Sequence, residues 1–365
     1  MGNTSGSGIS GSSFGTLTVS DVSINSSGQA LNLSTGTLSG SFDGVSSSGG
    51  TNNVLLAGVG TSGTFALGSG TLSDATSDAF KISGGNGSFS YSGTISNTIT
   101  LAVNIENKTG GTVTLSGDIN PTTAGKGISV SGNSGGSTIT FSGANKKINT
   151  GTGTGVNLSN NTGATIGFTN GGLDIDATSG AGFSATGGGT VTVQTGTNPN
   201  TIDTTTGTTL NVSATNIGSN GLTFRRISAN GAPNGIVLNA TGTTAGTYGG
   251  LTVTGTGTTD GSGGTIQNIT NRGGSFISAR DTSLSNMTFT NVGTVKGADP
   301  TNPTGTCGGL QSGTNTACNA GLHADAVTNL TLTNVDLSGA CSRASTRKCR
   351  RISPAHCPSC PARTA

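Results

Sequence analysis

Short stretches in which apolar and polar residues alternate recur along most of the chain. In Thr138–Phe141 the order is Thr-Ile-Thr-Phe, which places Ile139 and Phe141 on one face of an extended strand and the two threonines on the other. Turns that carry Gly or Asn separate these stretches. The pattern predicts many short strands, each with an apolar face toward an interior and a polar face toward water.

The predicted strands recur with a regular period. One motif occurs as TVTLSG, TITFSG, TIGFTN and TVTVQT, which begin at Thr112, Thr138, Thr165 and Thr190. A second motif recurs in Gly127–Val130, Gly155–Leu158 and Gly182–Ala185, and a third aligns Ala144–Ile148 with Gly171–Ile175. All three motifs repeat at nearly the same interval, roughly 25 to 28 residues, which is typical of a repeat architecture. Each period therefore holds about three short strands.

A period of this length leaves no room for a helix, and a single coil cannot bury its own apolar face, so the coils must stack on one another. We therefore predict an all-β fold, a right-handed, single-stranded parallel β-helix (a pectin-lyase-like solenoid) with about three short strands in each coil of about 25–28 residues. Coils stacked at about 4.8 Å would make a rod of roughly 60 to 70 Å.

The β-helix is expected to span residues 1–340, with a less regular stretch up to about residue 60. The alternation continues downstream in degenerate form at Leu222–Ile227, Met287–Val292 and Leu330–Val335. Residues 341–365 differ abruptly, because they contain four Cys and six Lys or Arg but no Gly. We expect this tail to be disordered or to result from a frameshift.

Composition and charge exclude several classes of partner. Of 365 residues, 66 are Gly and only 8% are charged, with a formal net charge of +2. A near-neutral chain without basic stripes before the tail indicates no nucleic-acid partner. The sequence also lacks an apolar run long enough to span a bilayer, so we expect no membrane insertion. The low charge argues against wholesale disorder, since disordered chains usually carry high net charge.

Four phrases carry a family resemblance: NKTGGTVTLSG, GVNLSNNTGATIGF, GLTFRRISANGAPNGIVLNATG and GGTIQNIT. They resemble the Gly/Thr-rich β-strand repeats of very large secreted bacterial surface proteins, such as autotransporter passengers and filamentous adhesins, over roughly residues 60–340. The resemblance implies a secreted or cell-surface location, associated with the outer membrane in a full-length protein. It implies a structural or adhesive role, with host or neighbouring-cell surface molecules, or polysaccharide, as partners and with self-association.

A parallel β-helix can also carry an enzyme that acts on polysaccharides, for which paired carboxylates are needed. The candidate pair is Asp174 and Asp176, which alternate with Leu173 and Ile175 and therefore point outward. One period upstream, Lys147 aligns with Asp174 and Asn149 with Asp176, which favours an ion pair between coils over catalysis. We predict no catalytic or cofactor-binding residues, and a polysaccharide-acting enzyme remains the alternative.

Threonine pairs at the starts of the TVTLSG-type motifs predict a regular array of hydroxyl groups on one sheet. The array consists of Thr112 and Thr114, Thr138 and Thr140, Thr165 with Gly167, and Thr190 and Thr192. Such arrays resemble the ice-binding face of some antifreeze proteins, a second alternative function, although Thr also suits any exposed strand. Gly167 interrupts the column.

The remaining candidates for chemistry lie near the C-terminus. Cys349, His356, Cys357 and Cys360 have thiolate spacing that suits zinc, but a second pair of ligands is missing, and we predict no metal site. Cys307 and Cys318 flank a Gly/Asn-rich insertion that a disulfide could close, and two free thiols are the alternative. Neither histidine, His323 or His356, has a nucleophile and an acid at an interpretable spacing.

Overall fold

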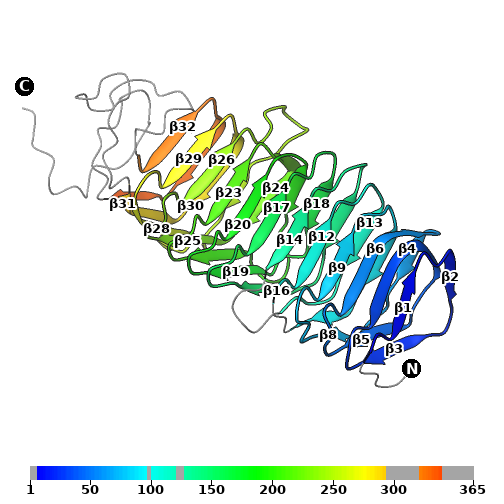
Figure 1. The fold of residues 1–365 in the computed structure, drawn as a ribbon. Helices are drawn as coiled ribbons and strands as arrows, with labels where there is room; N and C mark the ends of the chain where they lie inside the picture. Colours follow the sequence, from blue (N-terminus) through cyan, green and yellow to red (C-terminus); the bar gives the residue numbers. More distant parts are fainter. Residues whose placement is uncertain (1–5, 97–99, 121–126, 293–319, 339–365) are drawn as a thin grey trace, which may run out of the picture.

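The computed structural model describes residues 6–96, 100–120, 127–292 and 320–338, and every regular element in them is a β-strand (Figure 1). Parallel strands stack as a β-helix of about 11 turns with about 26 residues per turn. The predicted parallel β-helix with about three short strands per coil is confirmed. Among the described residues no helix could cross a membrane.

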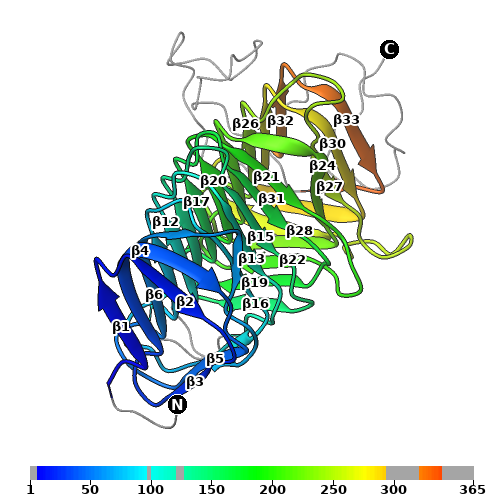
Figure 2. The same ribbon diagram turned by 90° about the vertical axis from the view of Figure 1, so that its right-hand side faces the viewer.

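The strands form three faces of the solenoid, which we name sheets A, B and C (Figure 2). Sheet A contains β1 (Ile9–Ser12), β2 (Thr16–Val19), β4 (Leu31–Gly40), β6 (Val54–Thr61), β9 (Phe80–Ser83), β12 (Val103–Glu106), β14 (Ile128–Ser131), β17 (Val156–Ser159), β20 (Phe183–Thr186), β23 (Leu210–Ser213), β26 (Ile236–Asn239), β29 (Gly274–Ile277) and β32 (Leu322–Asp325).

Sheet C follows sheet A in each coil, and sheet B completes the coil. Sheet C contains β7 (Thr64–Ala66), β10 (Ser88–Tyr91), β13 (Thr112–Leu115), β15 (Thr138–Phe141), β18 (Thr165–Phe168), β21 (Thr190–Val193), β24 (Asn216–Phe224), β27 (Leu251–Val253), β30 (Arg280–Ser285) and β33 (Thr328–Thr333).

Sheet B has two runs of strands, which single bridges through Ile119 connect. The first run is β3 (Ser23–Ser26), β5 (Gly44–Ser47), β8 (Thr71–Leu72) and β11 (Thr94–Ile95). The second is β16 (Lys146–Asn149), β19 (Leu173–Ala177), β22 (Thr201–Thr204), β25 (Arg226–Asn230), β28 (Gly264–Ile269), β31 (Met287–Val292) and β34 (Asp336–Ser338).

The register of the strands agrees with the sequence repeats. Thr112, Thr138, Thr165 and Thr190 are successive partners in sheet C. Ile128, Val156 and Phe183 are successive partners in sheet A, and Lys146 pairs with Leu173 in sheet B. The three sequence motifs therefore correspond to the three sheets.

Aromatic rings stack along the interior from coil to coil. Phe141 of β15 and Phe168 of β18 lie with ring centroids 4.7 Å apart and planes at 10°. Phe168 also meets Phe183 of sheet A edge to face at 5.8 Å. Full burial of one such ring stabilises the fold by about 1.5–3 kcal/mol. Because these contacts join neighbouring coils, each coil depends on the next for its core.

A sharp turn follows most sheet A strands from β1 to β32, and in β4 and β6 it lies within the strand. The exception is β2, which pairs with the second half of β4. The residue at the turn always has a positive φ, between 47° and 76°, which suits Gly and Asn best. It is Ser13, Thr35, Gly58, Gly84, Asn107, Gly132, Asn160, Gly187, Ala214, Ala240, Ser278 and Ala326 in successive coils. Gly or Asn occupies half of these positions, and Ser, Thr or Ala the other half.

The alternation continues downstream as predicted, but on different sheets. Met287–Val292 lies in sheet B, whereas Leu222–Phe224 and Leu330–Thr333 lie in sheet C. About 11 turns at about 4.8 Å give a rod of about 50 Å, shorter than predicted. One reason is that Ile236 and Gly274 are successive partners in sheet A, so the connection between them is longer than one period and adds residues without adding a coil.

Two lysines lie inside the solenoid, which the alternation did not predict. Lys108 is 0% exposed, and its Nζ donates to Gly87 O at 2.7 Å and lies 5.5 Å from the centroid of the Phe89 ring. Lys146 is 1% exposed, and its Nζ donates to three backbone carbonyls. Burial lowers the pKa of each lysine to about 8.

Candidate functional site

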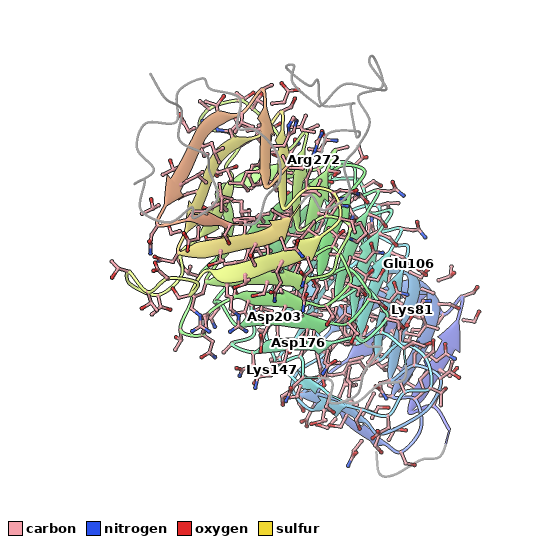
Figure 3. All side chains as sticks on the ribbon, turned by 90° about the vertical axis from the view of Figure 1, so that its left-hand side faces the viewer. Lys81, Glu106, Lys147, Asp176, Asp203 and Arg272 are labelled. Atoms are coloured by element: carbon pink, nitrogen blue, oxygen red, sulfur yellow. The ribbon has the colours of Figure 1, made fainter. Side chains whose placement is uncertain are left out.

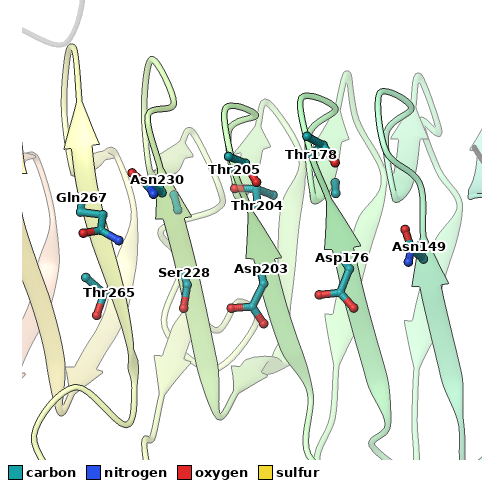
Figure 4. Close-up of a pocket in the computed structure, with 12 residues that line it drawn as sticks. Asn149, Asp176, Thr178, Asp203, Thr204, Thr205, Ser228, Asn230, Thr265 and Gln267 are labelled. Carbon is teal, nitrogen blue, oxygen red and sulfur yellow. The ribbon is translucent and has the colours of Figure 1, made fainter. Parts of the chain in front are cut away.

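A shallow hollow of about 490 Å³ lies on the outer face of sheet B (Figure 4). It crosses β16, β19, β22, β25 and β28, so its long direction follows the solenoid axis. We call it the sheet B groove. It is lined by Asn149, Asp176, Ala177, Thr178, Asp203, Thr204, Thr205, Ser228, Ala229, Asn230, Thr265 and Gln267.

The polar side chains of the groove form two rows, which Figure 4 shows on neighbouring strands. The floor row has one residue on each of five strands: Asn149, Asp176, Asp203, Ser228 and Thr265. The rim row stands near the ends of the strands and contains Thr178, Thr205, Asn230 and Gln267. Register places Asn149, Asp176, Asp203 and Ser228 directly beside one another. The rows therefore repeat once per coil.

Most groove side chains keep their hydrogen-bonding capacity for a ligand. Within the described part of the chain, the side chains of Asn149, Asp176, Ser228, Thr265 and Gln267 make no hydrogen bond or ion pair with protein. Their backbones are held by the parallel ladders, so the side chains are presented on a rigid surface. Hydroxyl and amide groups both donate and accept.

The charged groups of sheet A contrast with those of the groove. On sheet A, Lys81 lies 3.6 Å from Asp78 and 3.4 Å from Glu106. Asp78 also accepts hydrogen bonds from Thr100 at 3.0 Å and Asn104 at 2.8 Å. Figure 3 shows Lys81 and Glu106 apart from Asp176 and Asp203. The charged groups of the sheet A cluster pair with one another, whereas in the groove Asp203 is paired with Arg226 and Asp176 forms no ion pair among the described residues.

Asp176 has a perturbed carboxyl group. The walls of the groove partly desolvate it, which raises its pKa, and the nearby carboxylates of Asp174 and Asp203 raise it further. Arg226 acts in the opposite direction. Arg226 forms its ion pair with Asp203, not with Asp176. Asp176 is therefore the carboxyl group in the groove that has no cationic partner among the described residues.

The candidate carboxylates from the sequence are placed largely as predicted. Asp174 and Asp176 point outward, and Lys147 and Asn149 are their register partners. The predicted ion pair between Lys147 and Asp174 is wrong, since no salt bridge of the described residues joins them. Asp174 instead accepts a hydrogen bond from the Thr201 hydroxyl in the next coil, which holds the carboxylate away from Lys147.

Sequence reasoning missed Asp203, the residue that makes the groove acidic. Asp203 lies one coil beyond Asp176, in direct register with it. The same interval separates the other repeats, so counting one period onward from Asp176 would have identified Asp203. The motif around Asp203, Thr-Ile-Asp-Thr, lacks the glycines that mark the earlier coils, which makes the repeat hard to recognise beyond Ile175.

The predicted threonine array lies on sheet C, in register over the four predicted coils. Thr112, Thr138 and Thr165 are in register, and Gly167 leaves the predicted gap. Beyond Thr190 the register of β24 shifts, and Gly218 lies against the Thr192 methyl group. Thr192 is consequently only 9% exposed. The array therefore covers four coils before β24 interrupts it.

Of the other candidates, only His323 lies among the described residues, and it forms no catalytic site there. His323 pairs in register with Ser275 on sheet A, and burial followed by Arg272 lowers its pKa. Within the described residues, no group of three or more His, Cys, Asp or Glu could bind a metal ion. The cysteines proposed for a disulfide, Cys307 and Cys318, lie outside the described residues. So do the zinc candidates in the tail, Cys349, His356, Cys357 and Cys360.

Comparison with protein-family models, with curated proteins and with solved structures found no match to this chain.

Proposed function

We propose that this chain is a structural and adhesive segment of a secreted cell-surface protein, a stiff rod that displays a polar surface. The observation that carries the proposal is the unbroken in-register run of sheet A from β4 to β32. Its partly exposed outward positions in the central coils are Ser129, Asn157, Ser184 and Asn211. A uniform polar face on regularly stacked coils suits adhesion, because many equivalent side chains can contact one partner surface at the same time.

Stiffness follows from the direction of the hydrogen bonds. In a parallel β-helix the ladders run along the axis, so stretching or bending the rod breaks backbone hydrogen bonds in all three sheets together. Each coil also shares its aromatic core with the next. Such a rod holds a surface at a fixed distance from its point of attachment. The proposed partners are polysaccharide or surface molecules of a host or a neighbouring cell.

An adhesion assay tests this function. Beads coated with the chain are expected to bind bacterial or host cells, or immobilised polysaccharide, more than beads coated with an unrelated β-helix of similar size and net charge. Binding is expected to rise steeply with coating density, because many weak contacts act together. Equal binding by both kinds of bead on every surface tested would refute the adhesive role.

A polysaccharide-cleaving enzyme is a second candidate, which one observation favours. Asp176 has a raised pKa and stands in register beside Asp203, which Arg226 pairs. Carboxyl groups in unlike environments on one face suit a general acid and its partner. Incubation with polysaccharides and measurement of new reducing ends tests this role. Asp176→Asn and Asp203→Asn should each abolish cleavage, and no cleavage by the unaltered chain would exclude it.

A further inference from the structure

We propose that the sheet B groove binds an extended, unbranched glycan that runs along the solenoid axis, and that it prefers amino sugars to uronates. This inference rests on the proposed adhesive function and adds a specific glycan site on sheet B to the polar face of sheet A. The two rows of Figure 4, not the acidic pair alone, carry it. Three properties of the groove are relevant: its direction, its lining and its charge.

The direction of the groove suits a polymer. Its floor row crosses five strands, and at about 4.8 Å per strand it extends for about 20 Å. One pyranose unit of an extended glycan is close to one strand spacing in length. Each coil would therefore face one sugar, with a floor residue below the ring and a rim residue beside it. A compact ligand would leave most of the groove unfilled.

The lining suits a ligand rich in hydroxyl groups. Amides and hydroxyls that both donate and accept occupy both rows, and Asn149, Ser228, Thr265 and Gln267 have no protein partner for their side chains in the described structure. Among the described residues that line the groove, only Ala177 and Ala229 are apolar, and none is aromatic. An apolar or heteroaromatic ligand would thus find no platform for stacking. Sugar hydroxyls can satisfy the polar groups directly or through water.

The charge of the groove selects among glycans. Its described lining contains two carboxylates, Asp176 and Asp203, and no Lys or Arg. Asp203 already forms an ion pair with Arg226, whereas Asp176 forms none among the described residues, although Arg226 favours its charged form. The ammonium group of an amino sugar would give Asp176 a direct cationic partner through a charge-assisted hydrogen bond. Carboxylates of a uronate polymer would meet like charges instead.

The depth of the groove indicates weak binding at each site. A shallow and hydrated surface without an aromatic platform suits a dissociation constant on the order of 1 mM. Weak single sites suit a surface protein that is present in many copies, because avidity then multiplies the affinity by about 10² or more. The adhesive rod would thus bind a glycan-coated surface firmly and release single chains quickly.

Titration of the purified chain by NMR tests the proposal with three hexasaccharides. These are hexamers of glucosamine, N-acetylglucosamine and galacturonate. We expect the glucosamine hexamer to bind most tightly, the N-acetylated hexamer more weakly, and the galacturonate hexamer not at all. Asp176→Asn should weaken glucosamine binding roughly tenfold, the loss of one charge-assisted contact. It should leave binding of the N-acetylated hexamer within twofold.

A steric variant and its matched control locate the site. Ser228→Arg fills the floor of the groove, whereas Ser90→Arg places the same side chain on the outer face of sheet C. The first is expected to abolish binding of both amino-sugar hexamers and the second to leave it unchanged. Circular dichroism of both variants confirms that the fold is retained. Equal binding by both variants, or tighter binding of galacturonate, would overturn the assignment.

Failure of this assignment is distinct from failure of the adhesive function. If coated beads bind cells equally well with the unaltered chain and with Ser228→Arg, the rod is adhesive through another face and the groove assignment is wrong. If beads with the unaltered chain bind no surface, the proposed function itself is wrong.

Discussion

Lys146→Met tests whether the interior of the solenoid depends on a buried ammonium group. Lys146 occupies an inward position of β16, where its register partner in the next coil is Leu173. Its Nζ donates to the carbonyls of Gly143 at 2.5 Å, Thr169 at 3.0 Å and Gly171 at 2.6 Å. These carbonyls belong to the sheet C to sheet B turns of two neighbouring coils, so one side chain joins both turns. Methionine has nearly the same length but no donor.

The size of the effect follows from two opposing quantities. Loss of the donor removes a hydrogen bond from each of three buried carbonyls. Each loss costs about 1–3 kcal/mol of folding free energy, or about 6 kcal/mol together. Removal of the charge recovers its desolvation cost, which is about 3 kcal/mol for a pKa lowered from 10.5 to about 8. The folded state should therefore lose about 3 kcal/mol at pH 7. Lys147→Met, which alters the exposed neighbour, should change stability by less than about 0.5 kcal/mol.

Guanidinium unfolding followed by circular dichroism measures both variants. Hydrogen exchange of β16 and β19 adds a local readout, since solenoids can open one coil at a time. We expect faster exchange in these two strands for Lys146→Met and no change for Lys147→Met. Equal or greater stability of Lys146→Met would show that the desolvation cost outweighs the three hydrogen bonds, and would refute the reasoning.

Packing and charge at single residues give four more predictions. Lys108 and Lys146 have pKa values near 8 when folded and near 10.5 when unfolded, so the unfolded chain binds more protons between these values. Unfolding free energy should therefore rise as the pH increases from about 8 to about 10.5, and a fall would contradict the burial of both ammonium groups. Phe168→Ala removes the ring that contacts Phe141 and Phe183, and should cost about 3–5 kcal/mol in denaturant unfolding. Ala214→Gly relieves a positive φ of 49° and should stabilise the chain by up to about 1 kcal/mol, whereas a loss of stability would contradict the turn geometry. Asp176→Asn removes a like-charge neighbour of Asp203 and should raise the thermal midpoint slightly at low salt, an increase that about 1 M salt should abolish.

The sequence was sufficient to predict the regular part of the fold. Alternation identified the inward residues, and the period placed Thr112, Thr138 and Thr165 in one column, because regular coils contain nearly equal numbers of residues. Beyond the regular coils the period makes no assignment. The connection between Ile236 and Gly274 is longer than one period, so residue counting could not assign Met287–Val292 to a sheet.

The groove could be predicted only in part, for a different reason. The outward direction of Asp174 and Asp176 followed from alternation with Leu173 and Ile175. The hydrogen-bond partner of Asp174 could not be predicted in this way, because Lys147 and the Thr201 hydroxyl lie on opposite sides of the same carboxylate. Register alone cannot decide between two neighbours. That choice depends on side-chain rotamers, which the period does not determine.

The position of the acidic pair bears on function more than its charge does. Like charges on adjacent strands destabilise a sheet. Only 8% of the residues in this chain are charged, so two carboxylates on adjacent strands are not a consequence of a high charge density. On sheet A the charges are arranged so that Lys81 lies between Asp78 and Glu106. In the groove Asp176 has no such partner among the described residues, and the small side chains of Ser228 and Thr265 keep the floor open. A local conflict that the rest of the fold avoids is characteristic of a functional surface. A positively charged group from outside the chain would resolve this conflict, which is the interaction that the glycan proposal supplies.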